Sequence, residues 1–437
     1  MGEGDGFGPA AWVRAAVVVG RLTEGRAGLE FGRLDEQEVR RRASRQLGRL
    51  LIADDPGLRV LLADLAQAPL TPLGRVWLRS ELIRREVTQA RLEDEFRRRP
   101  GLLNTPLWRP LVVVGLPRTG TTLLLSLLGC DPEALVLPFW QLRRPYPVPR
   151  RRLDRATRIM RAAAMARLAR SMAPRLRDIH PVSALRPEED VFLFRDTGML
   201  AVPVTAPGYL GWLQATDPAP GYRTYRRHLQ VLLADRPGRR PVLKSPFHLG
   251  RLAALLAELP EAVVVWTHRD PAVALASWCS LAAVLASAAS DQMDLGALGR
   301  RWLSFWATET DRALAARTAA DPARFHDVGY EALVADSLGE VERLYARLGL
   351  ELSGAARRRM SRWIVRHHHR RRGRANPHRY SLADFELNAA VVDRRFGHYR
   401  EWIAANIEPP MPSAQISSND KVAEGHVSLN AFHPPWD

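Results

Sequence analysis

Three features of the sequence predict an α/β fold, in which a parallel β-sheet is flanked by helices and preceded by a helical segment. Residues 1–105 place apolar side chains at helical spacing and show no strand-like alternation. From Leu111 onward, short apolar, β-branched runs alternate with longer helical patterns. Such runs are typical of central parallel strands, which are covered on both faces. We therefore divide the chain into a helical N-terminal segment (1–105), an α/β domain (106–407) and a flexible tail without periodicity (408–437).

The α/β domain contains three predicted strands. The first is LVVVG, which starts at Leu111 and is stopped by glycine and proline. The others are Pro241–Ser245 and Val263–Thr267. Residues 271–290 form the longest uncharged stretch, but they are mostly alanine and serine and so transfer weakly into a bilayer. We predict that this stretch is a buried helix.

Composition and charge restrict the class of partner. The formal net charge is +17, so the expected partners are anionic, such as a polyphosphorylated cofactor, an acidic lipid surface or nucleic acid. Arginine carries most of the excess, which also reflects coding bias, and charge alone decides little. The two cysteines, Cys130 and Cys279, are too few for a disulfide framework, and no Cys/His spacing is typical of zinc. No export signal is evident, and we expect a cytoplasmic protein without a metal.

Residues 143–177 form a basic helical segment with a modest apolar face. Such a segment can lie peripherally on a membrane or receive an amphiphilic acceptor. A solvated, arginine-rich surface helix is the simpler interpretation, and we favour it.

The strand at Leu111 leads into the loop GLPRTGTT and then into an apolar helix. Gly115 and Gly120 allow backbone N–H groups to surround an anion at the positive end of that helix. The loop lacks the lysine that a nucleotide triphosphatase requires, because Thr121 occupies that position, and its cation is Arg118. A sulfuryl group is a monoanion, and its transfer needs one cation and backbone donors rather than Mg²⁺. Arg118 is placed to stabilise a phosphate leaving group.

GLPRTGTT resembles the 5′-phosphosulfate loop of sulfotransferases that use 3′-phosphoadenosine 5′-phosphosulfate (PAPS), which reads P-[KR]-[ST]-G-T-[ST]. The resemblance implies a P-loop-like α/β fold, PAPS as the donor and metal-free transfer. It also implies that the 5′-phosphate is bound by Arg118, Thr119, Gly120, Thr121 and Thr122.

A second motif follows the strand at Val263. Arg269 and Ser277 stand eight residues apart in THRDPAVALAS and resemble the 3′-phosphate motif of the same family. Asp270 is a suitable helix cap and Pro271 suits the first helical position. In the alternative interpretation, Arg269 only closes the strand by pairing with Asp270. We expect two separate anion pockets at the carboxyl edge of the sheet, which grip opposite ends of one adenosine bisphosphate.

The resemblance extends over about 111–402, and it is closest to a broad bacterial sulfotransferase group. Many relatives have a glutamate where this chain has Gln141, so the general base must lie elsewhere. We favour Glu188 or Glu189, followed by His180 and then His248. Helix-terminal solvated charges are an equally good interpretation of the two glutamates.

Other cations are candidates by resemblance. In related enzymes, a lysine at the end of the strand that corresponds to Pro241–Ser245 contacts the bridging oxygen of the cofactor, which makes Lys244 a second stabiliser. A basic loop at Arg371, Arg372 and Arg374 offers weaker candidates for closing over the nucleotide, and a solvated charge run is the better interpretation there.

Two other functions remain open at this stage. A P-loop kinase for a small alcohol would need Mg²⁺ and a loop lysine. A non-catalytic polyanion-binding protein would place aromatic residues among the basic ones, and we expect no nucleic-acid partner. The acceptor is expected to be a small molecule, a glycan or a lipid-like molecule, and the apolar stretch 191–213 favours an apolar acceptor.

Overall fold

The computed structural model describes residues 33–51, 54–147, 153–290, 292–372 and 380–407. Five parallel strands form one sheet in the order β2-β3-β1-β4-β5. Three of them are the predicted strands: β1 (Leu111–Gly115), β3 (Arg240–Lys244) and β4 (Val263–His268). The sequence did not indicate β2 (Ala134–Leu135) or β5 (Phe325–Gly329).

The strand β1 lies at the centre of the sheet and is buried on both faces. Side chains alternate across a strand, so Val112 and Val114 enter one hydrophobic core while Leu111 and Val113 enter another. This two-sided burial explains why the run contains no polar residue. The parallel α/β architecture predicted from the sequence is confirmed.

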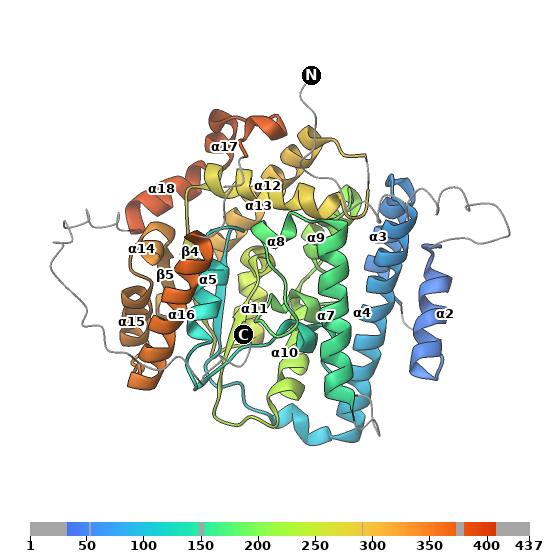
Figure 1. Ribbon diagram of the computed structural model, residues 1–437, viewed down its shortest axis with the longest axis horizontal. Helices are drawn as coiled ribbons and strands as arrows, with labels where there is room; N and C mark the ends of the chain where they lie inside the picture. The colour runs from blue at the N-terminus through green and yellow to red at the C-terminus, as the bar shows by residue number, and fades with distance from the viewer. Residues whose placement is uncertain (1–32, 52–53, 148–152, 291, 373–379, 408–437) are drawn as a thin grey trace.

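Helices cover both faces of the sheet (Figure 1). Residues of α5 (Thr121–Leu128), α15 (Ser337–Arg347) and α16 (Gly354–Arg372) belong to the core that contains Leu111. The larger core on the other face contains residues of α9 (Pro207–Ala215), α10 (Ala219–Leu233), α11 (Leu252–Glu258), α12 (Pro271–Ala286), α13 (Leu295–Thr318), α17 (Ala389–Arg395) and α18 (Gly397–Asn406).

The predicted buried helix at 271–290 is α12, whose side chains are almost all buried. The remaining helices are short or connect other elements: α6 (Phe139–Arg143), α7 (Asp154–Met172), α8 (Leu176–Ile179), α14 (Tyr330–Ala335) and the 3₁₀ turns η2 (Asp190–Leu193), η3 (Gly198–Ala201), η4 (Pro246–Arg251), η5 (Pro322–Arg324) and η6 (Ala383–Phe385). The described part of the basic segment 143–177 contains the helices α7 and α8. Within the described ranges, no helix is both long and apolar enough to cross a membrane. The predicted tail, 408–437, lies outside the described residues.

The described part of the N-terminal segment is helical, as predicted, and comprises α2 (Glu36–Leu47), α3 (Pro56–Gln67), α4 (Pro72–Arg98) and the turn η1 (Pro100–Asn104), whereas residues 1–32 lie outside the described residues. Leu58 and Leu82 belong to the same continuous core as Val114. These helices therefore share a core with the sheet, and the division at 105/106 remains a prediction.

A buried ion pair joins these helices to the rest of the fold. The Arg85 guanidinium on α4 lies 3.0 Å from Asp55 and 3.2 Å from Asp196, which is distant in sequence. Arg85 is 2% exposed and Asp55 is 1% exposed. Removing one partner from such a site leaves a buried charge without compensation.

We expect Arg85→Met to lower the free energy of unfolding by about 3 kcal/mol, because Asp55 and Asp196 lose their buried cation and keep only the more exposed Arg195 as a charged partner. Urea denaturation followed by circular dichroism measures this change. The exposed Arg75→Met on the same helix is the control, with an expected effect within about 0.5 kcal/mol. Equal effects of the two substitutions would contradict the structural role of Arg85.

Candidate active site

The loop between β1 and α5 is held in a conformation that only certain residues allow. Gly115 has φ 147°, and an added Cβ would lie 2.5 Å from the Thr267 carbonyl oxygen, so no other residue fits there. Gly120 has φ 90° at the N-terminus of α5. Arg118 adopts φ 73°, which is an unfavourable left-handed conformation for a side chain. A strained arginine in a glycine-bounded loop is typical of a functional position.

The three threonines of the loop have different environments. The Thr119 hydroxyl donates to the Leu116 carbonyl at 2.7 Å and lies 2.6 Å from the Thr267 hydroxyl. It therefore fastens the loop to β4 and is completely buried. Thr121 is also buried, whereas Thr122 is exposed. Of the three predicted phosphate-binding hydroxyls, that of Thr122 is the accessible one.

The residues of the two predicted phosphate motifs meet at one place. The Arg118 Nε donates to the Ser277 hydroxyl at 3.1 Å, across 159 residues of chain. A guanidinium N–H of Arg269 donates to the Arg118 carbonyl at 3.0 Å. We expected two separate pockets; the side chain of one motif bonds directly to the other here, and the separation into two pockets stays a prediction. The parallel strands β1 and β4 are neighbours, so the loops that follow them are neighbours as well.

Arg269 does not serve as a partner for Asp270. Its guanidinium lies over the Tyr330 ring at 3.9 Å from the ring centre. Asp270 instead caps α12 by accepting from the Ala272 N–H at 2.8 Å, and it pairs with Arg400 at 2.8 Å. Among the described residues, no carboxylate is within salt-bridge distance of Arg269. The structure thus supports the functional interpretation of Arg269 over strand closure.

Lys244, the predicted second stabiliser, lies at the carboxyl end of β3 beside the loop after β1. It is 1% exposed, yet its ammonium group lies 2.9 Å from the Glu189 carboxylate and 3.3 Å from the Thr122 hydroxyl. A buried ammonium group requires such a partner to stay charged. Glu189 therefore compensates the charge of Lys244.

Glu188 pairs with a different partner, the imidazole of His180, at 3.3 Å. Burial opposes ionisation of the Glu188 carboxyl, but the charge and hydrogen bond of His180 and the charge of Lys244 outweigh it and lower the Glu188 pKa to about 2. His180 directly follows Ile179, whose carbonyl accepts from Arg118 at 3.3 Å. The His180–Glu188 pair therefore lies next to the loop cation.

Gln141, the position where relatives often have glutamate, lies in a neighbouring segment. Backbone hydrogen bonds join 137–140 to 184–188, including the Glu188 N–H to the Leu137 carbonyl at 3.3 Å. The Gln141 side chain is 7% exposed, and its carbonyl oxygen has no hydrogen-bond partner among the described residues. The carboxylates of Glu188 and Glu189 therefore lie on a segment that adjoins Gln141, and their role as a base stays a prediction.

Asp190 is a positioning residue that the sequence reasoning missed. It is 1% exposed and accepts from the Lys244 backbone N–H at 2.7 Å and from His248 at 2.9 Å. The other ring nitrogen of His248 lies 2.8 Å from the Tyr222 hydroxyl, so both nitrogens are engaged in a buried network. His248 thus supports Asp190, and a base role for His248 stays a prediction. The run of three acidic residues at 188–190 was the available signal.

Comparisons with known proteins identify related chains. A model of the sulfotransferase family matches residues 110–354. Omega-hydroxy-beta-dihydromenaquinone-9 sulfotransferase Stf3 of Mycobacterium bovis is 25% identical over 326 residues, which cover 70% of this chain and 77% of the relative.

Two solved structures are similar over most of their length. Sulfotransferase STF1 of Mycobacterium tuberculosis is 32% identical with a TM-score of 0.72, covering 83% of this chain and 98% of the solved one. Sulfotransferase STF9 of Mycobacterium avium is 25% identical with a TM-score of 0.71, covering 86% and 98%. These matches cover more of the chain than the family model does.

The lowered pKa of Glu188 predicts a pH dependence of stability. Because the folded-state pKa, about 2, lies below the ordinary value of 4.5, the ionised carboxylate stabilises the fold above pH 4.5, and this contribution is lost as the pH falls through about 2. We expect Glu188→Gln to lose less stability than the wild type over that interval, as measured by urea unfolding at several pH values. His180→Asn should make the free energy of unfolding depend less on pH over the same interval, because it removes the main partner of the Glu188 carboxylate. Identical pH profiles for Glu188→Gln and the wild type would contradict this assignment.

Proposed function

Because the chain belongs to the sulfotransferase family, we propose that it transfers a sulfuryl group from PAPS to a hydroxyl or amine of an acceptor. The observation that carries the proposal is the convergence of Arg118, Lys244 and Arg269 at the carboxyl edge of one parallel sheet. Family membership favours this reaction over the kinase and the non-catalytic polyanion-binding protein considered from sequence. The donor and the acceptor are our proposals.

The residues at this edge suit an adenosine bisphosphate. The strained loop provides backbone N–H groups at the N-terminus of α5, together with Arg118 and the exposed Thr122 hydroxyl, for a 5′-phosphate. Arg269 and Ser277 provide a guanidinium and a hydroxyl for a 3′-phosphate. Since Arg118 already bonds to Ser277, we propose that binding exchanges this internal hydrogen bond for bonds to phosphate oxygens.

We assign the stabilisation of developing negative charge to Lys244 and Arg118. PAPS would supply the activated sulfuryl group. Lys244 is held by Glu189 and by the end of β3, so its charge is oriented before the reaction and needs little reorganisation. In this assignment Glu189 keeps Lys244 charged, and it is not the base.

We assign proton acceptance to the His180–Glu188 pair. A carboxylate with a pKa near 2 is a weak base at neutral pH, whereas an imidazole beside it can take a proton and be stabilised by the carboxylate. We therefore place His180 before Glu188 as the proton acceptor, with Glu188 orienting the ring and stabilising the imidazolium. This order differs from the one favoured by sequence alone.

We propose a lipid-like alcohol as the acceptor. The support is the Mycobacterium bovis relative, which is described as acting on an omega-hydroxylated menaquinone. The apolar stretch 191–213 does not strengthen the case, because Val191, Leu193 and Leu210 belong to the hydrophobic core. Hydroxylated isoprenoids and sugars, offered to the same enzyme with PAPS, separate a lipid-like acceptor from a polar one.

Calorimetry with 3′-phosphoadenosine 5′-phosphate in EDTA tests the donor site. We expect metal-independent binding that Arg118→Ala and Arg269→Ala each weaken by about 2 kcal/mol, the contribution of a charged hydrogen bond. The exposed Arg75→Ala is the matched control and should bind like the wild type. Tight binding of ATP that requires Mg²⁺, with no affinity for the bisphosphate, would overturn the proposal.

Turnover of an accepted alcohol tests the base. We expect His180→Ala to slow turnover by about 10²-fold or more, because a positioned base contributes at least this much, while nucleotide affinity is retained. Glu188→Gln should also slow turnover, since the side chain at 188 no longer pairs with the imidazole as a carboxylate. The exposed Glu401→Gln is the control. Unchanged turnover in His180→Ala and Glu188→Gln would remove both residues from the mechanism.

A further inference from the structure

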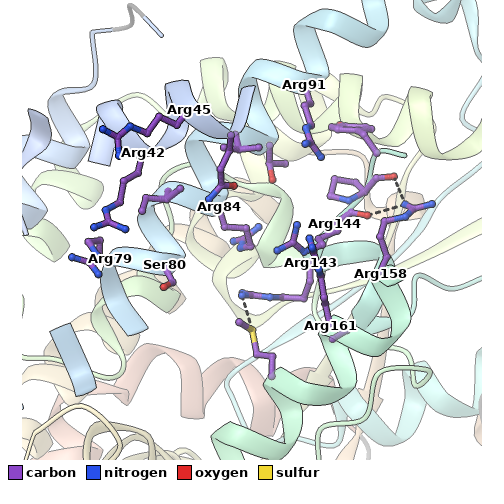
Figure 2. Close-up of a pocket in the computed structure, with 18 residues that line it drawn as sticks. Arg42, Arg45, Arg79, Ser80, Arg84, Arg91, Arg143, Arg144, Arg158 and Arg161 are labelled. Atoms are coloured by element: carbon purple, nitrogen blue, oxygen red, sulfur yellow. Dashed lines mark hydrogen bonds between the residues drawn. The ribbon is translucent and has the colours of Figure 1, made fainter. Parts of the chain in front are cut away.

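A cationic cavity lies apart from the candidate active site, between the N-terminal helices and the basic segment 143–177. Its volume is about 440 Å³, which is the size of a small-molecule site. Half of its eighteen lining residues are arginines, and none of the lining residues is an aspartate or glutamate. Figure 2 shows the arginine side chains gathered around this space. They are Arg42 and Arg45 of α2, Arg79, Arg84 and Arg91 of α4, Arg143 of α6, Arg144, and Arg158 and Arg161 of α7.

Three carboxylates that do not line the cavity pair with lining arginines and compensate part of this charge. Glu81 pairs with both Arg84 and Arg143. Likewise, Glu38 pairs with Arg42, and Asp154 pairs with Arg158 at 2.8 Å.

Several other arginines have no such compensation. In the part of the chain that the structure describes, no carboxylate lies within salt-bridge distance of four lining arginines, namely Arg45, Arg79, Arg144 and Arg161. The cavity therefore holds an excess of positive charge that the protein itself does not neutralise.

Burial and the crowding of like charges both act on the pKa of these arginines. Burial and then the neighbouring charges of Arg161, Arg143 and Arg91 lower the pKa of Arg144. For Arg84, burial and then Arg143 lower the pKa to about 10. An anion in the cavity would relieve this repulsion, because opposite charges a few ångströms apart attract strongly near a protein surface.

We propose that this cavity binds a phosphate-bearing anion with several negative charges. Guanidinium groups bind phosphate oxygens through paired N–H donors, and arginines on different helices around the cavity can bind more than one phosphate group. Ser80 and Thr88 are further hydroxyl-bearing residues of the lining. A ligand with a single charge would leave most of the uncompensated guanidinium groups without a partner.

The cavity is distinct from the PAPS site proposed above. It is lined by residues of α2, α4, α6 and α7, whereas that site is built on the loops after β1 and β4. The cavity and the proposed PAPS site contact different residues of η2. Arg84 donates to the Phe192 carbonyl at 3.4 Å and Arg143 lies over the Phe192 ring, whereas Asp190 holds Lys244.

Titration calorimetry with tripolyphosphate tests the site in the full chain, with and without saturating 3′-phosphoadenosine 5′-phosphate to block the other anion site. We expect one binding event that persists with the nucleotide present. The double substitution Arg79→Gln with Arg161→Gln should weaken it by about tenfold or more for each arginine removed. Nucleotide affinity should stay unchanged.

A matched control uses arginines of the same two helices that do not line the cavity. Arg75→Gln with Arg167→Gln removes the same charge from α4 and α7, where both side chains are exposed. We expect this variant to bind tripolyphosphate like the wild type. Equal weakening in the two double variants, or binding abolished by the nucleotide, would overturn the proposal, and so would the absence of tripolyphosphate binding to the wild type.

The source of the phosphate is distinguished with vesicles of phosphatidylcholine with and without phosphatidic acid. A lipid headgroup ligand predicts binding to the phosphatidic acid vesicles that tripolyphosphate competes away and that the Arg79→Gln with Arg161→Gln variant loses. A free phosphorylated metabolite predicts the tripolyphosphate result without vesicle binding. Vesicle binding that persists equally in both double variants would show a general charge effect and would count against the site.

Discussion

The parallel orientation of every strand is the constraint on which the site depends. Parallel strands end at the same edge of a sheet, so residues at or shortly after the carboxyl ends of β1, β3, β4 and β5 lie at one edge whatever their distance in sequence. Arg118, Lys244, Arg269 and Tyr330 each hold such a position. The hydrogen bond between Arg118 and Ser277 and the stacking of Arg269 on Tyr330 are consequences of this arrangement.

Three consecutive acidic residues each bind a different partner at this edge of the sheet. Glu188 pairs with His180, Glu189 pairs with Lys244, and Asp190 accepts the backbone N–H of Lys244. Adjacent side chains on an extended segment point in different directions, which lets each carboxylate reach a separate donor. One short segment thus orients both the proposed proton acceptor and the proposed stabilising cation.

The excess positive charge of the chain is unevenly compensated. At the Arg85 ion pair, each buried cation has carboxylate partners, as the low dielectric of the interior demands. At the arginine cavity, several guanidinium groups lack them within the described ranges. The arginines that give the chain its net charge of +17 therefore fall into two groups. Some are on the solvated surface, and others are clustered around one cavity.

The sequence alone was enough to predict the fold class and three of the strands, and it singled out the residues that we propose for the two phosphate motifs. Runs such as LVVVG carry this information locally, since two-sided burial excludes polar residues from a central strand. It did not reveal β5, whose polar His326 and Asp327 belong to an edge strand, or the role of Asp190. Only the tertiary structure decided that Arg118 meets Ser277, that Glu188 and Glu189 have different partners, and that arginines of α2, α4 and α7 surround one cavity. These contacts join residues far apart in the chain, and residue spacing within a segment contains no information about which segments pack together.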